Sequence, residues 1–226
     1  LQMFILCVLC LLWTNLNAEM NGSMLDLNNF KICLIGNEKD EVLQNIVRVL
    51  SEEIEKRTHI LLQNTSEILP NSDYILLANI NSLSPVYKKH LISFPKEKLK
   101  QIKPEGFAIF NEEVQGKNRI WIIGRDKRGV LFGVGKLLRI MKYSPNSLKI
   151  EIPVNIIESP ISPIRGHQLG YRTQANSYDA WDIKQYDQYI RELTFFGVNS
   201  IENIPFQDER PAPLMPVSRR EMNRAM

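Results

Sequence analysis

Short apolar runs alternate with two amphipathic segments along this chain, and this alternation limits the folds that it can adopt. In the first segment, Asp40 precedes apolar residues spaced three and four apart, which predicts a helix with one buried face. These apolar residues are Leu43, Ile46, Val47, Leu50 and Ile54. The second segment opens at Arg128 and Gly129 with the same spacing and ends near Pro145. Two such helices need a sheet against which to bury their apolar faces.

Six apolar runs bounded by Gly, Pro, Asn or Ser predict the strands of that sheet. They are Phe30–Ile35, Ile60–Leu62, Tyr74–Ala78, Gly106–Phe110, Arg119–Ile123 and Leu148–Ile152. Because some of these runs follow one another without an intervening helix, the pattern predicts a mixed sheet with helices packed on one face. The fold class is therefore α/β, with an α+β domain expected over residues 28–157.

Three prolines then indicate a stiff linker, after which the pattern restarts with a strand, a helix and a second strand. The prolines are Pro153, Pro160 and Pro163, and the elements are predicted over Ile164–Tyr171, Asp182–Phe196 and Val198–Ile204. A further helix is predicted to begin near Arg219. Such β-α-β units are typical of a (β/α)8 barrel, of which residues 158–226 would be the truncated start. One unit cannot cover both faces of a parallel sheet.

The sequence pattern at the N-terminus predicts a signal peptide over residues 1–18. An uninterrupted apolar run, Phe4–Trp13, is followed by polar residues and by Ala18, a small residue suited to cleavage. The run is too short to span a bilayer, so we expect a secreted or periplasmic protein with no membrane span. The alternative is a buried N-terminal helix whose cysteines enter a core. After cleavage only Cys33 remains, which leaves neither a disulfide framework nor a cysteine-based metal site.

Charge and motif spacing argue against nucleic acids, metals and nucleotides as partners. The 28 Lys and Arg residues are scattered among 25 Asp and Glu residues, so no basic stripe marks a nucleic-acid surface. The three histidines lie in unrelated contexts, and no metal or cofactor is expected. The glycines from Gly124 to Gly135 do not form a phosphate loop, since Lys136 is followed by Leu137 rather than Ser or Thr. Close packing of a helix on the sheet explains these glycines better.

Polar side chains are concentrated in the predicted barrel start, where a strand buried on both faces would be apolar. The carboxyl ends of barrel strands and the loops after them form the substrate mouth. Arg172 and Trp181 follow the first strand, and Glu202 and Asn203 end the second. Arg and Glu bind sugar hydroxyls and Trp stacks on sugar rings, so these are candidate carbohydrate-binding residues. The alternative is an internal salt bridge between Arg165 and Glu202, with Trp181 capping the helix.

His167 lies within the same polar strand. An imidazole there can contact a substrate or transfer a proton. The alternative is a structural histidine whose hydrogen bonds are satisfied inside the protein. We therefore treat His167 as a candidate for substrate binding and assign it no catalytic step.

Several motifs, taken in order, resemble a known family of enzymes. The segments Pro104–Phe107, Ile120–Asp126 and Arg128–Gly133 resemble the N-terminal accessory domain of family 20 β-N-acetylhexosaminidases and of α-glucuronidases. Downstream, Pro163–Gly166 is similar to the Arg-Gly of the first barrel strand in the same enzymes. The resemblance covers roughly residues 30–205, and the order of the motifs carries more weight than any one of them.

This resemblance implies that the chain is the N-terminal fragment of a glycoside hydrolase that breaks down polysaccharides or glycans. It implies that Arg165 hydrogen-bonds sugar hydroxyls, and that the catalytic Asp and Glu lie beyond residue 226. The segment Gly166–Arg172 is closer to glucuronidase-like enzymes than to hexosaminidases. Glycoside hydrolysis ordinarily needs two carboxyl groups, and Glu202 is the one carboxylate at a predicted strand end, so the fragment is expected to be inactive. The rival interpretation is a non-catalytic carbohydrate-binding or scaffold protein.

Overall fold

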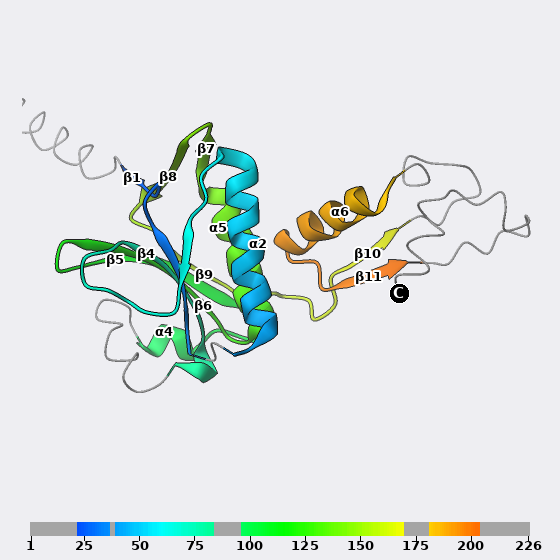
Figure 1. Ribbon diagram of the computed structural model, residues 1–226. Helices are drawn as coiled ribbons and strands as arrows, with labels where there is room; N and C mark the ends of the chain where they lie inside the picture. Colours follow the sequence, from blue (N-terminus) through cyan, green and yellow to red (C-terminus); the bar gives the residue numbers. More distant parts are fainter. Residues whose placement is uncertain (1–21, 37–38, 84–95, 170–180, 204–226) are drawn as a thin grey trace, which may run out of the picture.

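The computed structural model describes residues 22–36, 39–83, 96–169 and 181–203 (Figure 1). The predicted signal peptide and the helix predicted near Arg219 lie outside these ranges. Within the described ranges, no helix is long and apolar enough to cross a membrane.

A six-stranded mixed sheet forms the centre of the first unit, with the order β3-β2-β4-β6-β5-β9. The strands are β2 (Lys31–Ile35), β3 (Gln63–Thr65), β4 (Tyr74–Asn79), β5 (Phe107–Val114), β6 (Lys117–Gly124) and β9 (Asn155–Glu158). Neighbours from β3 to β6 run parallel, whereas β5 is antiparallel to both β6 and β9. The predicted α/β fold with a mixed sheet is confirmed.

Two long helices cover one face of this sheet (Figure 1). They are α2 (Glu41–Thr58) and α5 (Lys127–Ile140). Asp40 caps α2 by accepting hydrogen bonds from the backbone N–H groups of Val42 and Leu43 at 3.1 and 3.3 Å. A Cβ at Gly133 would lie 2.6 Å from the side chain of Ile122 on β6, so α5 approaches the sheet closely there. Helix-to-sheet packing therefore accounts for this glycine.

On the opposite face of the sheet lie residues 80–83 and 96–102. These residues contain the 3-10 helix η1 (Ile80–Ser82) and the short helix α4 (Lys96–Lys100), and Leu83, Leu99 and Ile102 are buried against the sheet. Helices therefore lie on both faces, which corrects the expectation of one covered face. Five residues give no helical periodicity, which is why the sequence did not reveal α4.

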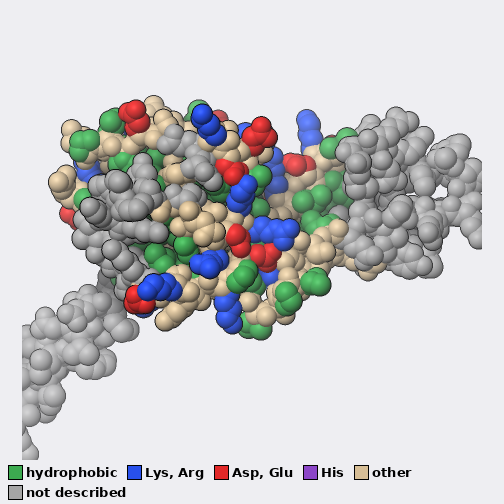
Figure 2. All heavy atoms as spheres, turned by 90° about the horizontal axis from the view of Figure 1, so that it is seen from below, with side chains coloured by type: hydrophobic (Ala, Val, Ile, Leu, Met, Phe, Trp, Pro, Cys, Tyr) green, Lys and Arg blue, Asp and Glu red, His purple; other side chains and the backbone are tan. Residues whose placement is uncertain are grey.

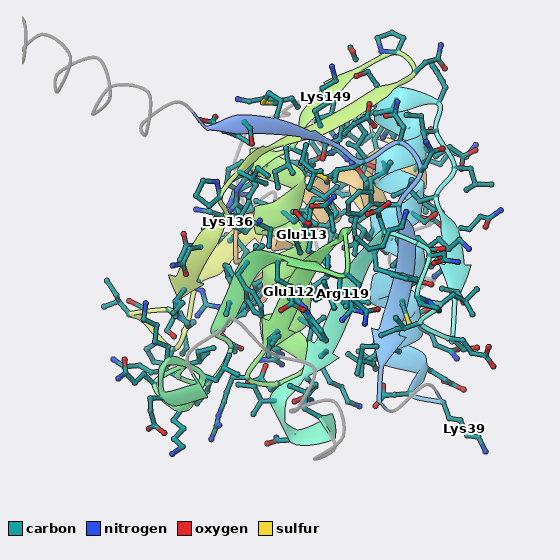
Figure 3. All side chains as sticks on the ribbon, turned by 90° about the vertical axis from the view of Figure 1, so that its left-hand side faces the viewer. Lys39, Glu112, Glu113, Arg119, Lys136 and Lys149 are labelled. Carbon is teal, nitrogen blue, oxygen red and sulfur yellow. The ribbon has the colours of Figure 1, made fainter. Side chains whose placement is uncertain are left out.

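A buried polar cluster lies on the same face, at the ends of β5 and β6. The indole N–H of Trp121, a fully buried residue, donates to Glu112 Oε1 at 2.7 Å. Arg119 lies opposite Glu112 in the β-ladder, with its Nη1 3.9 Å from the same oxygen (Figure 3). The carboxylate is thus buried beside a cation and a hydrogen-bond donor, as a charge in a protein interior requires.

A three-stranded antiparallel sheet, in the order β1-β8-β7, adds its apolar side chains to the helix side of the core. Its strands are β1 (Ser23–Asp26), β7 (Lys142–Ser144) and β8 (Ser147–Ile152). β9 follows β8 after Pro153 and pairs with β5. Pro153 therefore lies between two strands of the first unit, and the connection to the second unit contains only Pro160 and Pro163 of the three predicted linker prolines.

The second unit is a parallel β-α-β unit that forms a sheet of its own, apart from the larger one (Figure 1). It consists of β10 (Gly166–Leu169), α6 (Ile183–Phe195) and β11 (Ser200–Asn203). Asp182 caps α6 in a capping box with Gln185. Its two strands pair from Gly166 opposite Ser200 to Leu169 opposite Asn203. The order and direction of these three elements agree with the sequence-based expectation.

Candidate functional site

The carboxyl ends of β10 and β11 lie side by side, because the two strands are parallel and in register. Gln168 pairs with Glu202, and Leu169 pairs with Asn203. The backbones of Glu202 and Asn203 therefore lie beside the carboxyl end of β10, at the edge of the sheet where both strands end. Arg172 and Trp181 were also predicted at this edge. Arg172 lies outside the described residues, whereas Trp181 is described.

His167 points from β10 toward α6. Its Nε2 lies 3.0 Å from the hydroxyl of Tyr189, and the two rings meet edge to face with centroids 5.6 Å apart. Successive side chains of a strand point to opposite faces, so Gln168, which is exposed, lies on the face away from the helix. Gln168 is thus the polar residue of β10 that lies beside Glu202 in the register. His167 has Tyr189 as its hydrogen-bond partner within the protein.

Trp181 joins the same aromatic group at the start of α6. Its ring lies edge-on to Tyr189 and Tyr186, with centroid distances of 5.1 and 5.5 Å. Such edge-to-face geometry is favourable for aromatic pairs. Trp181 is half-buried, and its position just before Asp182 places it at the helix entrance, where it packs on the first turns of α6.

Arg165 lies immediately before β10, at the end of the strand opposite to Leu169. Its guanidinium Nη2 donates to Glu105 Oε2 at 2.7 Å, Nε to the carbonyl of Gly197 at 2.6 Å, and Nη1 to the carbonyl of Ser162 at 2.8 Å. The acid that pairs with Arg165 in this structure is therefore Glu105, which the sequence analysis did not select. A signal for it existed, since Glu105 belongs to the Pro104–Phe107 motif, which served only to recognise the fold.

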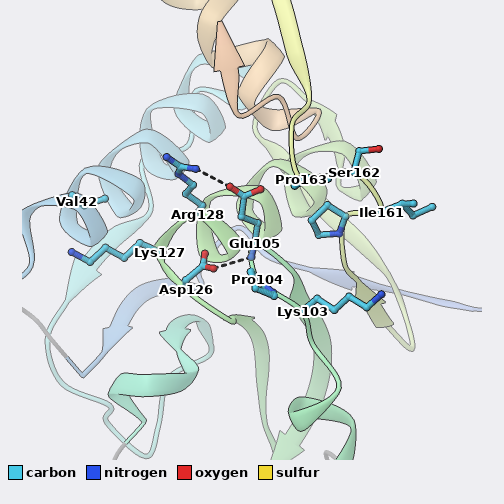
Figure 4. Close-up of a pocket in the computed structure, with 11 residues that line it drawn as sticks. Val42, Lys103, Pro104, Glu105, Asp126, Lys127, Arg128, Ile161, Ser162 and Pro163 are labelled. Atoms are coloured by element: carbon cyan, nitrogen blue, oxygen red, sulfur yellow. Dashed lines mark hydrogen bonds and ion pairs between the residues drawn. The ribbon is translucent and has the colours of Figure 1, made fainter.

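A hollow of about 790 Å³ opens beside Glu105, between α5 and the connection to β10 (Figure 4). Its lining residues are Val42, Lys103, Pro104, Glu105, Asp126, Lys127, Arg128 and Pro160 to Pro163. Arg128 pairs with Glu105 at 2.9 Å, and Lys127 pairs with Asp40 at 2.6 Å. Basic and acidic side chains are interspersed over the face of the molecule drawn in Figure 2. Across the part of the chain that the structure describes, no three His, Cys, Asp or Glu side chains gather to hold a metal ion.

The ionisation of Glu105 is predicted to strengthen the junction between the two units. Burial raises the pKa of its carboxyl, but hydrogen bonds from Arg128, Arg165 and Asn199 outweigh burial and hold the pKa below its ordinary value of 4.5. A depressed folded-state pKa stabilises the protein above the unfolded-state value, and this contribution is lost as the pH falls through the folded-state value.

We therefore expect wild type to exceed Glu105→Gln in free energy of unfolding at neutral pH, with the difference shrinking below about pH 4.5. Urea unfolding of both proteins between neutral and acidic pH measures this difference. Other carboxyl groups titrate in both proteins and cancel in the comparison. A difference that stays constant with pH would show that the charge of Glu105 has no part in the junction.

Comparison with known proteins gives a family match over the first unit. Residues 31–137 match the model of the glycosyl hydrolase family 67 N-terminus. The resemblance to the N-terminal part of a glycoside hydrolase is confirmed. A search of curated proteins gives no match.

Solved structures of glycoside hydrolases share the fold over a longer stretch. A family 20 exo-β-N-acetylglucosaminidase from Vibrio harveyi is 16% identical with a TM-score of 0.55, covering 82% of this chain and 23% of its own. The family 115 4-O-methyl-α-glucuronidase BtGH115A is 13% identical with a TM-score of 0.56, covering 88% and 28%. CpGH84B is 17% identical with a TM-score of 0.57, covering 88% and 31%. The glycoside-hydrolase-like chain thus spans less than a third of the length of each of these three proteins.

Proposed function

We propose that this chain is the N-terminal part of a secreted enzyme that hydrolyses O-glycosyl bonds in polysaccharides or glycans. The observation that carries the proposal is the succession of two units: a glycoside-hydrolase N-terminal domain is followed directly by a parallel β-α-β unit. The similarity to glycoside hydrolases over 82–88% of the chain, beyond the family match at residues 31–137, supports this assignment. The carbohydrate is the partner that such a parent enzyme would bind.

In this proposal, residues 158–226 begin a (β/α)8 barrel, and its substrate mouth starts at the carboxyl ends of β10 and β11. Glu202 and Asn203 end β11, and Arg172 and Trp181 come from the segment that joins β10 to α6; these four are the proposed sugar contacts. Arg165 and His167 bind Glu105 and Tyr189 in this structure, and their contacts with sugar stay predictions.

The proposed chemistry needs a proton donor on the glycosidic oxygen and a second carboxyl group, or the substrate's own acetamido group, to stabilise the cation that forms. Glu202 supplies one carboxylate at a strand end. The catalytic pair is therefore proposed to come from strands that follow β11, and a protein limited to these 226 residues is expected to be inactive.

The experiment is to measure hydrolysis of nitrophenyl glycosides by the full-length gene product, with the N-acetylglucosaminide and the glucuronide in the panel. We expect turnover of one of them by the full-length protein and none by residues 19–226 alone. Binding of a sugar without turnover would support the carbohydrate-binding interpretation instead. If the protein neither binds nor hydrolyses any sugar in the panel, both the enzyme and the carbohydrate-binding interpretations are contradicted.

A substitution in the full-length protein tests the strand-end position. Glu202→Gln keeps the shape of the side chain but removes its charge, and hydrogen bonds to a charged group contribute about 1.5–3 kcal/mol. We therefore expect kcat/KM to fall by roughly tenfold to a hundredfold. Glu113→Gln, an exposed change on β5 of the first unit, is the matched control and should leave kcat/KM unchanged. Equal activity of the two variants would remove Glu202 from the site.

A further inference from the structure

We propose that Glu105 is a positioning residue through which the first unit holds the amino ends of both strands of the second unit, and so fixes where their carboxyl ends lie. The effect on a sugar substrate rests on the proposed function. The contacts that hold the strands do not depend on it.

Glu105 is itself held firmly by the first unit. Its backbone adopts the left-handed conformation with φ of 62°. Its N–H donates to Asp126 Oδ2 at 2.8 Å, while the other oxygen of Asp126 caps α5 through the N–H of Gly129 at 2.8 Å (Figure 4). Arg128 Nη1 donates to Glu105 Oε1 at 2.9 Å. The carboxylate is therefore fixed relative to the amino end of α5.

The same carboxylate binds the residues that precede both strands of the second unit. Arg165, one residue before β10, donates to Glu105 Oε2 at 2.7 Å, and Asn199, one residue before β11, donates to it at 2.9 Å. Arg165 and Asn199 also bind each other. The N–H of Arg165 donates to Asn199 Oδ1 at 2.9 Å, and the N–H of Asn199 donates to the Arg165 carbonyl at 3.1 Å. One acidic side chain thus connects both strand starts to the first unit.

Among the described residues, the other ion pairs between the units reach the helix instead of the strands. Arg191 on α6 pairs with Glu52 at 2.7 Å, and Glu192 on α6 pairs with Arg57 at 3.1 Å. The far end of a four-residue strand lies about 10 Å from its start, so a tilt at Glu105 displaces the strand ends where the sugar contacts are proposed. Glu105 is therefore placed to orient the strands, and the pairs on α6 to dock the helix.

The charge of Glu105 is essential to this arrangement. A carboxylate offers only acceptors and suits the donors of Arg128, Arg165 and Asn199, whereas an amide places two N–H donors among them. Glu105→Gln therefore changes the chemistry of the junction while keeping its size.

The first test is amide hydrogen exchange of the complete chain. Glu105→Gln is expected to raise the exchange rates of β10 and β11 about tenfold and to leave those of β4 and β6 unchanged, because only the junction is weakened. Glu113→Gln, which removes the same charge from the exposed surface, is expected to change neither. Unchanged exchange in β10 and β11 would overturn the proposal.

A double-mutant cycle separates this junction from general docking. Combining Glu105→Gln with Arg165→Gln is expected to raise exchange by less than the product of the two single effects, since each substitution alone already breaks the ion pair between the two side chains. Combining Glu105→Gln with Arg191→Gln is expected to give the product of the two single effects. Independent effects of Glu105 and Arg165 would contradict the proposed connection.

The last arm measures kcat and KM of the full-length protein on the panel glycoside that it hydrolyses. Glu105→Gln is expected to lower kcat/KM about tenfold, in proportion to the faster exchange, although Glu105 lies at the far end of the strands from the proposed sugar site. Faster exchange with unchanged kcat and KM would overturn the positioning role. If wild type hydrolyses no glycoside, the proposed function fails, and the exchange measurements still decide whether Glu105 orients the strands.

Discussion

Gly135→Ala is expected to separate α6 from α5. A Cβ at position 135 would lie 2.5 Å from the Cα and 2.6 Å from the carbonyl oxygen of Phe195, and backbone atoms cannot give way as a flexible side chain can. Phe195 is only 3% exposed, and Arg139 of α5 donates to its carbonyl. Overpacking of this kind costs about 1–3 kcal/mol. We therefore expect amide exchange in α6 to accelerate about tenfold or more.

In the first unit, Gly135→Ala is not expected to accelerate amide exchange in α5. Alanine favours a helix interior over glycine by about 1 kcal/mol, so α5 itself should not be weakened. Gly166→Ala is the matched control, because its added Cβ would meet no atom closer than the Ser200 carbonyl oxygen at 3.8 Å. Unchanged exchange in α6 of Gly135→Ala, or equal acceleration in the control, would contradict the described contact between the units.

Trp121→Ala is expected to lower the free energy of unfolding of the first unit by about 3–5 kcal/mol, because it empties a large, fully buried site in the core on the face of the sheet opposite α2 and α5. The same change removes the indole donor from the buried carboxylate of Glu112. Urea unfolding followed by circular dichroism measures the loss.

Trp121→Phe separates the two contributions. A smaller phenyl ring remains at the site, and Glu112 loses its indole hydrogen bond, a loss that is expected to cost about 1–3 kcal/mol. A phenylalanine variant as stable as wild type would show that the hydrogen bond contributes nothing. Equal losses for the two variants would show that ring packing contributes nothing.

Elements with a long periodic pattern could be predicted from the sequence. The sequence predicts both ends of α6 and the start of α2 to within one residue, because each helix presents a repeated apolar stripe behind an aspartate cap. The strand predicted over Ile60–Leu62 lies three residues later, at β3, and the short strands β1 and β7 were not predicted. Three or four residues carry too few alternations to distinguish a strand from a loop, and pairing with distant partners decides their position.

The linker prediction erred at Pro153 for a related reason. A proline next to a strand indicates a break in the pattern, but antiparallel pairing with β5 creates β9 directly after it. Only tertiary contacts contain that information.

The candidate site was predicted in its elements and not in its side-chain contacts. The neighbouring ends of β10 and β11 follow from the β-α-β pattern, which the sequence shows. The direction of His167 depends on which face of β10 is covered by α6, and the pairing of Arg165 with Glu105 joins residues that lie 60 positions apart. Neither follows from local spacing, because strand alternation fixes relative directions and leaves the buried face open.

We propose that β10, α6 and β11 open a sugar-hydrolysing barrel. The decisive experiment is to sequence the native transcript through and beyond the codon for Met226. We predict an open reading frame of about two hundred further residues, the length that a (β/α)8 barrel still requires, with an acidic pair at the end of a later strand. A stop codon immediately after Met226 in the native transcript would contradict the claim.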